Sequence, residues 1–228
     1  MKALAIDCAT EVLTVAAKDE NHYVKVTMSL GNKQSEKLLP AIDYVFSELS
    51  LSAKDLDYTT LTLGPGTFTG LRLGLSTLKA LSLSYGIPIY GIDTLTAYAY
   101  PYKSAIESVL SVLENRDDEY FYSFFVRGEK LNEIQDKSCE EILKQIDPEN
   151  SVLVCGAGAK HFVDYVNMNT PLFSVHTFAP VSDVTESLFE LAEQKIAQKE
   201  KPLADYDGPL YARKSEAEIV REKNLLGK

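Results

Sequence analysis

Apolar residues follow two patterns along the chain, continuous runs and faces that recur every three or four positions, and these predict alternating strands and helices. In the first half, continuous runs predict five strands, over residues 3–6, 12–17, 23–28, 58–63 and 87–92. Leu38 and Ile42 lie on one face of a helix between the third and fourth strands, and we place Pro40 in the first turn of that helix. A further short helix should begin at Asp93 or Thr94.

The second half repeats this order. Apolar runs again predict strands, over residues 108–113, 120–126, 130–134 and 151–155. Ser138 and Glu141 have the spacing of a capping box and should begin a helix. Further helices are expected over 159–166, from Ser182 or Asp183 onward, and over 216–223.

Both halves therefore have the order βββαβα, and their marked residues correspond. Asp7 and Glu114 each end the first strand of a half, and the glycine turns 64–66 and 156–158 occupy equivalent places. This order resembles the duplicated ribonuclease-H-like unit of the superfold shared by actin, sugar kinases and heat-shock ATPases. We therefore predict an α/β protein of two such lobes, residues 1–103 and residues 104–228, the second ending in an irregular tail.

The helix predicted over 68–85 follows a glycine-dense turn, and Thr67 or Thr69 should cap its first turn. Its apolar arc is wider than the stripe of about 100° that one sheet face covers, so it needs a second cover. Gly70 and Gly74, one turn apart, would let another backbone approach closely. The second cover is either a neighbouring helix of the same chain or a partner subunit.

Composition narrows the functional classes. The chain has 228 residues, of which 45% are hydrophobic, which suits a buried core. A net charge of −10 and a pI of about 4.9 disfavour direct binding to a nucleic-acid backbone. Three scattered cysteines are typical of a reducing compartment. Because the sequence has neither a signal peptide nor an apolar stretch long enough to cross a membrane, we expect a cytoplasmic protein.

A nucleotide site is the first candidate for chemistry. In the superfold, acids that end the two first strands face the cleft between the lobes and hold metal-bound phosphates. Asp7, Thr10 and Glu114 are the corresponding residues here, with Gly156 and Gly158 in the second glycine turn. Cys8 and Ala9, however, occupy positions where active relatives usually have glycine, so we expect a vestigial site. An actin-like enzyme that hydrolyses a nucleotide with Asp7 and Glu114 is the alternative.

One stretch of the sequence resembles the signature of a particular family. Residues 64–74 match almost residue for residue the signature Gly-Pro-Gly-Ser/Thr-Phe-Thr-Gly-x-Arg-x-Gly of the TsaB (YeaZ) family. Residues 6–11, 35–40 and 209–213 resemble three shorter motifs of that family, Ile-Asp-Thr-Ala/Ser-Thr-Glu, Ser-Glu-x-Leu-Leu-Pro and Pro-x-Tyr-x-Arg. The matches run nearly from end to end. The sequence therefore resembles bacterial proteins required for threonylcarbamoyl modification of adenosine in tRNA.

The resemblance implies a noncatalytic role. TsaB-like proteins pair with a catalytic paralogue, TsaD, through the first two helices of the N-terminal lobe, and they work with the ATPase TsaE. They also form homodimers through the same surface. The resemblance thus implies that this chain needs no cofactor alone, that ATP or ADP can enter with the complex, and that tRNA is contacted only indirectly. It places the partner interface at these residues: Leu38, Ile42, Gly70, Leu71, Gly74, Leu75, Leu78 and Leu81.

Two positions depart from the family pattern. Gln34 replaces a histidine that many members have, and Glu114-Asn115-Arg116 replaces the usual Asp-Ala-Arg. Both changes argue against catalytic use of these positions.

A peptidase is a less favoured alternative. The three histidines form no HExxH pair, no Gly-x-Ser-x-Gly elbow is present, and Cys155 near His161 lacks a third partner. The histidines and cysteines also lack the spacing of metal ligands, so we expect no metal. The charged tail, which includes Arg213 and Lys214, is most simply a solvated surface, and contact with tRNA in the complex is a minority hypothesis.

Overall fold

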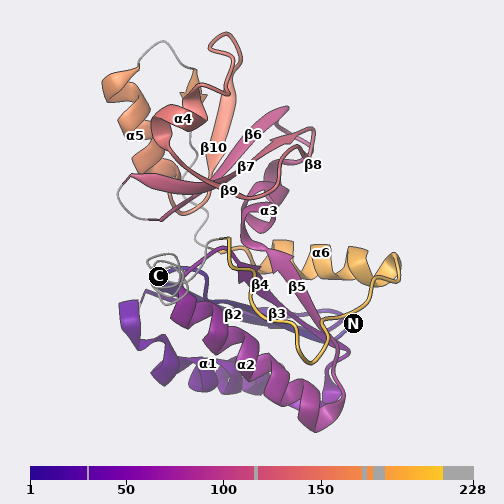
Figure 1. The fold of residues 1–228 in the computed structure, drawn as a ribbon. Helices are drawn as coiled ribbons and strands as arrows, with labels where there is room; N and C mark the ends of the chain where they lie inside the picture. The colour runs from indigo at the N-terminus through magenta and orange to yellow at the C-terminus, as the bar shows by residue number, and fades with distance from the viewer. Residues whose placement is uncertain (30, 116–117, 171–173, 177–182, 213–228) are drawn as a thin grey trace, which may run out of the picture.

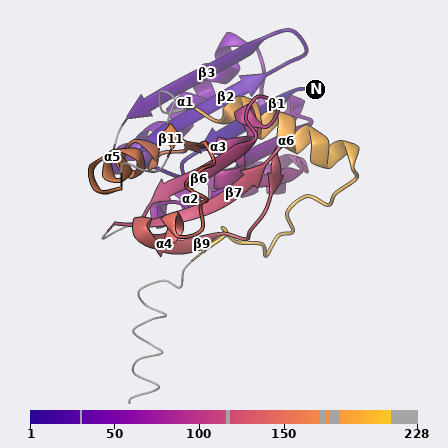
Figure 2. The same ribbon diagram turned by 90° about the horizontal axis from the view of Figure 1, so that it is seen from above.

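The two lobes each have a mixed β-sheet with helices packed against it (Figure 1). The computed structural model describes residues 1–29, 31–115, 118–170, 174–176 and 183–212. Lobe 2 lies above lobe 1 in this view, and Figure 2 shows the same arrangement from above. Within the described part of the chain, no helix combines the length and the apolar character needed to cross a bilayer.

The sheet of lobe 1 has five strands in the order β3-β2-β1-β4-β5. Its strands are β1 (Ala3–Asp7), β2 (Val12–Lys18), β3 (Tyr23–Ser29), β4 (Tyr58–Gly64) and β5 (Ile89–Asp93). β1 pairs antiparallel with β2 and parallel with β4, and all five of its residues are buried. A central strand covered on both faces explains why its sequence is a continuous apolar run.

Helices cover both faces of this sheet. α1 (Gln34–Glu48) and α2 (Phe68–Tyr85) lie side by side on the lower face, and α6 (Thr185–Ala197) lies on the upper face (Figure 1). α3 (Thr94–Ala99) leads from lobe 1 to lobe 2, and Asp93 caps it by accepting a hydrogen bond from the N–H of Thr96 over 2.9 Å. Short 3-10 helices lie at Gly31–Lys33, Ala53–Asp55 and Tyr100–Tyr102.

Lobe 2 repeats the sheet of lobe 1. Its strands are β6 (Ser108–Glu114), β7 (Glu119–Val126), β8 (Glu129–Lys130), β9 (Gln135–Ser138), β10 (Val152–Cys155) and β11 (Val175–His176). The order β11-β10-β6-β7-β8, with β9 also paired to β7, corresponds to the order of lobe 1 when β8 and β9 together take the place of its third strand. The duplicated fold predicted from the sequence is therefore confirmed.

The helices of lobe 2 are shorter. α4 (Cys139–Leu143) begins with the predicted capping box, in which Ser138 and Glu141 bond each other's backbone N–H groups. α5 (Ala159–Asn169) follows the second glycine turn and packs Phe162 and Val166 against the sheet. These two helices correspond to α1 and α2 of lobe 1 but have fewer turns.

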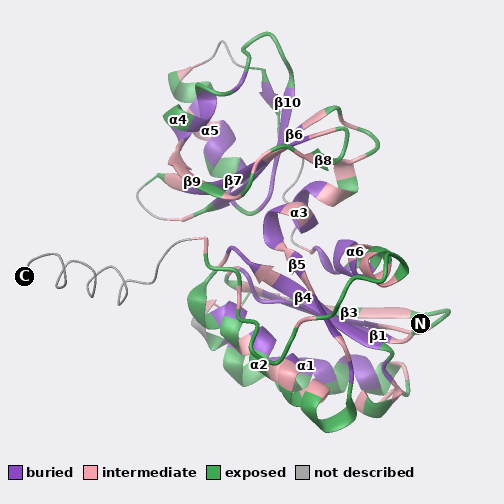
Figure 3. Ribbon diagram, turned by 45° about the vertical axis from the view of Figure 1, so that its right-hand side comes forward, coloured by how far each residue is buried: buried purple, intermediate pink, exposed green. Residues whose placement is uncertain are grey.

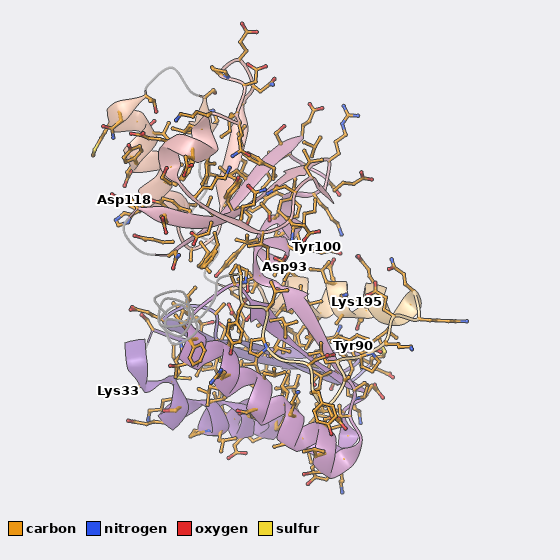
Figure 4. All side chains as sticks on the ribbon, in the orientation of Figure 1. Lys33, Tyr90, Asp93, Tyr100, Asp118 and Lys195 are labelled. Atoms are coloured by element: carbon orange, nitrogen blue, oxygen red, sulfur yellow. The ribbon has the colours of Figure 1, made fainter. Side chains whose placement is uncertain are left out.

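A shared hydrophobic core joins the two lobes. Residues of β1, β5, α3, β6, β7 and α6 form one buried cluster, which includes Tyr98 and Leu188. At the same junction Lys130 donates to Asp93 over 2.5 Å, and Asp93 and Tyr100 are labelled there in Figure 4. A boundary at residue 103 separates the two sheets, but α6 packs on the first sheet and so belongs structurally to lobe 1.

Three details differ from the sequence prediction. Pro40 lies inside α1 rather than in its first turn, because the helix already begins at Gln34. One polar strand expected over 130–134 is instead two short strands, β8 and β9, at the edge of the sheet. Thr67 is the N-cap of α2, but its side chain makes no capping hydrogen bond. The helix expected over 216–223 lies outside the described residues.

Candidate functional site

A cleft lies between the two lobes and has a volume of about 500 Å³. Lobe 1 contributes the turn after β1 and the first glycine turn, and lobe 2 contributes the end of β6 and the second glycine turn. Its lining residues are Ala9, Thr10, Glu11, Val12, Gly66, Thr67, Leu113, Glu114, Asn115, Phe121 and Ala157. Thr10 and Glu114, both predicted from the sequence, therefore face each other across this cleft.

Asp7 does not line the cleft. Only 4% of its surface is exposed, and its Oδ1 accepts hydrogen bonds from the N–H of Ala9 over 3.0 Å and from the hydroxyl of Thr62 over 2.8 Å. Burial raises the pKa of this carboxyl above its usual range, although the two hydrogen bonds oppose that shift. Asp7 is thus a buried carboxyl that holds the turn after β1 against β4, and its charge is not directed at a ligand.

The other predicted polar residues also have partners inside the chain. Thr10 accepts a hydrogen bond from the N–H of Val12 over 3.2 Å. Glu114 is exposed, and its Oε1 lies 3.2 Å from Nδ1 of His161. The cleft therefore places hydroxyl, amide and carboxylate groups around a space, but its acidic side chains Glu11 and Glu114 disfavour a phosphate group.

The glycines of the two turns allow close backbone packing and do not widen the cleft. A Cβ at Gly66 would lie 2.5 Å from the carbonyl oxygen of Ala9, and one at Gly158 would lie 2.8 Å from the backbone nitrogen of Glu114. Gly156 packs equally closely under the carbonyl of Val112. Gly156 and Gly158 therefore let their turn pack on the end of β6, whereas Ala157 between them lines the cleft.

Gly70 has the same role in α2. A Cβ there would lie 2.1 Å from the carbonyl oxygen of Cys8, so the close approach predicted for this glycine is to the turn after β1 of the same chain. Gly74 differs, because its nearest contacts, the side chains of Cys8 and Ile6, lie at an ordinary 3.6 Å.

The cysteines are buried, and none of them resembles a nucleophile. Burial raises the pKa of Cys155 to about 12 and raises that of Cys8 as well, so both remain protonated thiols at neutral pH. His161 contacts Glu114. Across the described ranges, no group of three or more His, Cys, Asp and Glu side chains is arranged to hold a metal ion.

The apolar face of α2 is covered by the chain itself. Leu71, Leu75 and Leu78 are at most 4% exposed, and Leu75 and Leu78 belong to the buried core cluster of lobe 1. Leu38 and Ile42 of α1 are buried in the same way, and Leu81 is half-buried. Seven of the eight residues that we placed at a partner interface, including Gly70 and Gly74, thus lie inside the folded chain.

The outward sides of α1 and α2 form a groove that includes Ile42 and Leu81 of the predicted interface, together with residues that the sequence analysis did not name. This groove of about 440 Å³ runs between the helices and is lined by Leu39, Ile42, Asp43, Phe46, Ser47, Leu51, Ser52, Ala53, Thr77 and Leu81. Leu39 is 61% exposed at its edge, and Ser76 and Ala80 of α2 are exposed nearby. Figure 3 shows this outer side as exposed, in contrast to the buried side towards the sheet.

Comparison with known proteins then decides the family. The family model described as TsaD, tRNA N6-adenosine threonylcarbamoyltransferase, matches residues 30–146, just over half of the chain. The "tRNA threonylcarbamoyladenosine biosynthesis protein TsaB" of Buchnera aphidicola subsp. Schizaphis graminum is 30% identical over 151 residues, which cover 59% of this chain and 71% of that protein. The chain belongs to the TsaB (YeaZ) family. The TsaB protein of Escherichia coli is 28% identical over 131 residues, and the match covers 57% of each chain, a little over half.

Solved structures give the same fold for this TsaB family member. YeaZ from Pseudomonas aeruginosa superposes with a TM-score of 0.74 at 21% identity, covering 92% of this chain and 99% of that one. A second Pseudomonas aeruginosa structure, described as similar to peptidase YeaZ, has a TM-score of 0.79 at 22% identity and covers 93% and 99%. In this TsaB family member, Gly66 and Gly70 of the signature pack closely on the turn after β1, and the outward sides of α1 and α2 are exposed.

Proposed function

We propose that the chain is a noncatalytic partner that binds and activates a TsaD-type catalytic paralogue during threonylcarbamoyl modification of adenosine beside the tRNA anticodon. A TsaE-type ATPase belongs to the same proposal. Two relatives are named for tRNA threonylcarbamoyladenosine biosynthesis, and the family model that matches half of the chain is that of the transferase. These names support the process, and the outward surface of lobe 1 supports the part that we propose for this chain.

The observation on which the proposal depends is the outward side of α1 and α2. We define the docking face as Leu39 and Asp43 of α1 together with Ser76, Thr77 and Ala80 of α2. The groove of about 440 Å³ lies along it, with a largely apolar floor formed by side chains such as Ile42 and Phe46. Small side chains at Ser76 and Ala80, one turn apart, allow a partner helix to approach closely, and Leu39 offers an exposed apolar contact.

Partner binding also suits the charge and the cleft. With a net charge of −10 the chain is a poor direct ligand for tRNA, so RNA would be held mainly by other subunits. The carboxyl of Asp7 accepts hydrogen bonds from Ala9 and Thr62 inside lobe 1. It therefore does not line the cleft, where an active enzyme of this superfold would need it. Activation then follows from population shift, because a partner conformation that binds the docking face more tightly becomes more populated.

Light-scattering mass on a sizing column tests the proposal. The chain is measured alone and then mixed with the TsaD-type protein of the same source, and we expect a one-to-one heterodimer. Leu39→Arg should weaken the complex at least about a hundredfold, since it places an unpaired charge in the apolar groove. Leu131→Arg is the matched control, because Leu131 is 63% exposed and lies in lobe 2, far along the chain from the docking face. It should bind as tightly as wild type.

Two results would contradict the proposal. Separate peaks for the two proteins at micromolar concentration, with this chain monomeric, would remove partner binding. Separate peaks with this chain dimeric, even with the TsaD-type protein in large excess, would contradict it too, because the partner should displace the second copy from the docking face. ATP turnover by this chain alone that Asp7→Ala abolishes would instead support the nucleotide-hydrolysing alternative.

A further inference from the structure

Phe68, Arg72 and Tyr211 form an exposed cluster at the beginning of α2, which we call the clasp. Tyr211 belongs to the irregular segment that follows α6 and returns along lobe 1, drawn in yellow in Figure 1. Its ring stacks on Phe68 with ring centroids 5.5 Å apart and an interplanar angle of 26°. The guanidinium of Arg72 lies 3.8 Å from the centroid of Phe68, and its Nε donates to the hydroxyl of Tyr211 over 2.7 Å. The three side chains therefore hold one another in place on the surface.

The clasp contributes little to the core of lobe 1. Phe68 and Tyr211 are 45% and 44% exposed, and Arg72 is exposed as well. Phe68 and Arg72 belong to the motif at residues 64–74, in which close packing explains Gly66 and Gly70 but not these two exposed side chains. Phenylalanine, tyrosine and arginine are enriched where proteins bind one another. The composition of the clasp is therefore that of a protein contact.

The charge of Arg72 has no counterpart among the described residues. Its Nε is bonded to Tyr211, but its two terminal amino groups have neither a hydrogen bond nor an ion pair in that part of the chain. α2 itself contains no Asp or Glu. Arg127, the other arginine in the described ranges, instead pairs with Glu107 over 2.8 Å. An arginine that is fixed in place without an acid, in a chain of net charge −10, is complementary to a carboxylate outside the chain.

The clasp adjoins the docking face. Arg72 lies one turn before Ser76, and at about 100° per residue the two exposed side chains are only about 40° apart on α2. A second hollow, of about 310 Å³, lies near the beginnings of α1 and α2, and Phe68 and Leu73 line it on the α2 side. Leu73 is in turn one turn before Thr77, which lines the groove of the docking face. The outward surface of the two helices therefore continues from the groove to the clasp.

We propose that Arg72 contacts the TsaD-type partner directly and binds a carboxylate of that protein, at the end of the docking face where the clasp lies. This inference rests on the proposed function. Its physical basis is preorganisation, because stacking on Phe68 and the hydrogen bond to Tyr211 already fix the guanidinium, so that less side-chain freedom is lost on binding. A guanidinium can also bind a carboxylate through two parallel hydrogen bonds, which would orient the partner along α2.

The salt dependence of partner affinity tests this inference. The dissociation constant for the TsaD-type partner is measured on the full-length chain without RNA, at salt concentrations of about 50 mM and about 500 mM. Arg72→Gln should bind about tenfold more weakly than wild type at the lower concentration, because the carboxylate of the partner loses its cation. At the higher concentration the difference should shrink to about threefold, since salt screens the attraction.

Matched variants separate the contact from stability. Arg127→Gln is the same substitution at the other described arginine, which is 79% exposed in lobe 2, and its affinity should equal that of wild type at both salt concentrations. Tyr211→Phe retains the stacking on Phe68 but loses the hydrogen bond from Arg72, so it should bind about threefold more weakly through lost preorganisation. Melting temperatures of all variants should lie within a few degrees of wild type.

Failure of the inference and failure of the proposed function give different results. If wild type does not bind the partner, the proposed function fails and the inference fails with it. If wild type binds and Arg72→Gln binds equally well, the inference is overturned while the proposed function stands.

Three further results would also overturn the inference. A loss of affinity in Arg72→Gln that is independent of salt, or that accompanies a fall of more than about 10 °C in melting temperature, would mean that the clasp acts through the fold. A loss that appears only when tRNA is added would assign the cation to RNA. Weakened self-association of Arg72→Gln, with unchanged affinity for the partner, would assign it to a second copy of the chain.

Discussion

Lobe 1 and lobe 2 share one topology and the same close packing of a glycine turn near the end of the first strand, but their helices differ in length. In both lobes a glycine turn packs on the end of the first strand, Gly66 on Ala9 in lobe 1 and Gly158 on Glu114 in lobe 2. The helix that follows has 18 residues in lobe 1 and 11 in lobe 2. Glycine therefore preserves the junction in both lobes, while helix length differs.

The helices that precede these turns differ even more. α1 has 15 residues, whereas its counterpart α4 has 5. Two long helices side by side give lobe 1 an outer surface with an apolar groove, and the described part of lobe 2 has only shorter ones. The comparison teaches that a duplicated fold can retain a cleft between its lobes while the outer helical surface of one lobe alone carries an apolar groove in the described part of the chain.

The inner face of α2 should be the most sensitive part of this comparison. Leu75 is 4% exposed and packs in the core of lobe 1, so Leu75→Arg buries an unpaired charge and should lower the free energy of unfolding by at least about 4 kcal/mol. Thermal unfolding followed by circular dichroism measures it. Leu39→Arg, on the outer face of α1, should change stability by less than about 1 kcal/mol.

A folded Leu75→Arg monomer with lost partner binding would contradict the buried position. It would return the partner interface to the residues first proposed from the sequence.

Replacing the closely packed glycine of either turn should destabilise the protein for the same reason in both lobes. Gly66→Ala and Gly158→Ala place a Cβ 2.5 and 2.8 Å from backbone atoms, so each should destabilise the protein by about 2–3 kcal/mol, the first more than the second. Denaturant unfolding measures both.

Gly74→Ala is the control for these variants. Its Cβ would meet its nearest atoms at 3.6 Å inside a helix, so the substitution should be neutral or stabilise the protein by about 0.5 kcal/mol. Equal behaviour of all three alanine variants would mean that close packing does not explain why glycine occupies equivalent places in the two lobes.

Local sequence patterns predicted most of these helices and strands, and the errors of the prediction have physical causes. The runs that became β1 and β6 were identified because central strands are apolar throughout, and Ser138 and Glu141 identified the start of α4. The start of α1 was missed because its first turn has little apolar periodicity. Gln34 is instead held by a hydrogen bond that its Nε2 donates to the carbonyl of Thr10, which sequence spacing does not indicate.

The partner surface shows a second limit. Apolar periodicity correctly identified Leu71, Leu75 and Leu78 as one face of α2, but it cannot tell which surface covers that face. Tertiary packing brings the sheet, α1 and residues 203–211 around α2, so the helix, which was predicted to need a second cover, is covered on several sides. The docking face consists of small and polar residues with few apolar ones, and such residues have no distinctive pattern in a sequence.

The two acids that end the first strands of the lobes give the smallest expected effect. Asp7 is buried and its pKa is raised, chiefly by burial, whereas Glu114 is exposed. Stability from the protonated Asp7 is fully present below the unfolded pKa of about 3.8 and is lost as pH rises through the folded value. Asp7→Asn cannot ionise, and its Oδ1 can still accept from Ala9 and Thr62.

The stability of Asp7→Asn relative to wild type should therefore increase as the pH is raised from 4 to 8, because only wild type must then ionise a buried carboxyl. Unfolding measured across that range checks the slope. A slope of the opposite sign for Asp7→Asn would mean that the ionised carboxylate is the stabilised form. The hydrogen bonds from Ala9 and Thr62 would then outweigh the effect of burial on the carboxyl of Asp7.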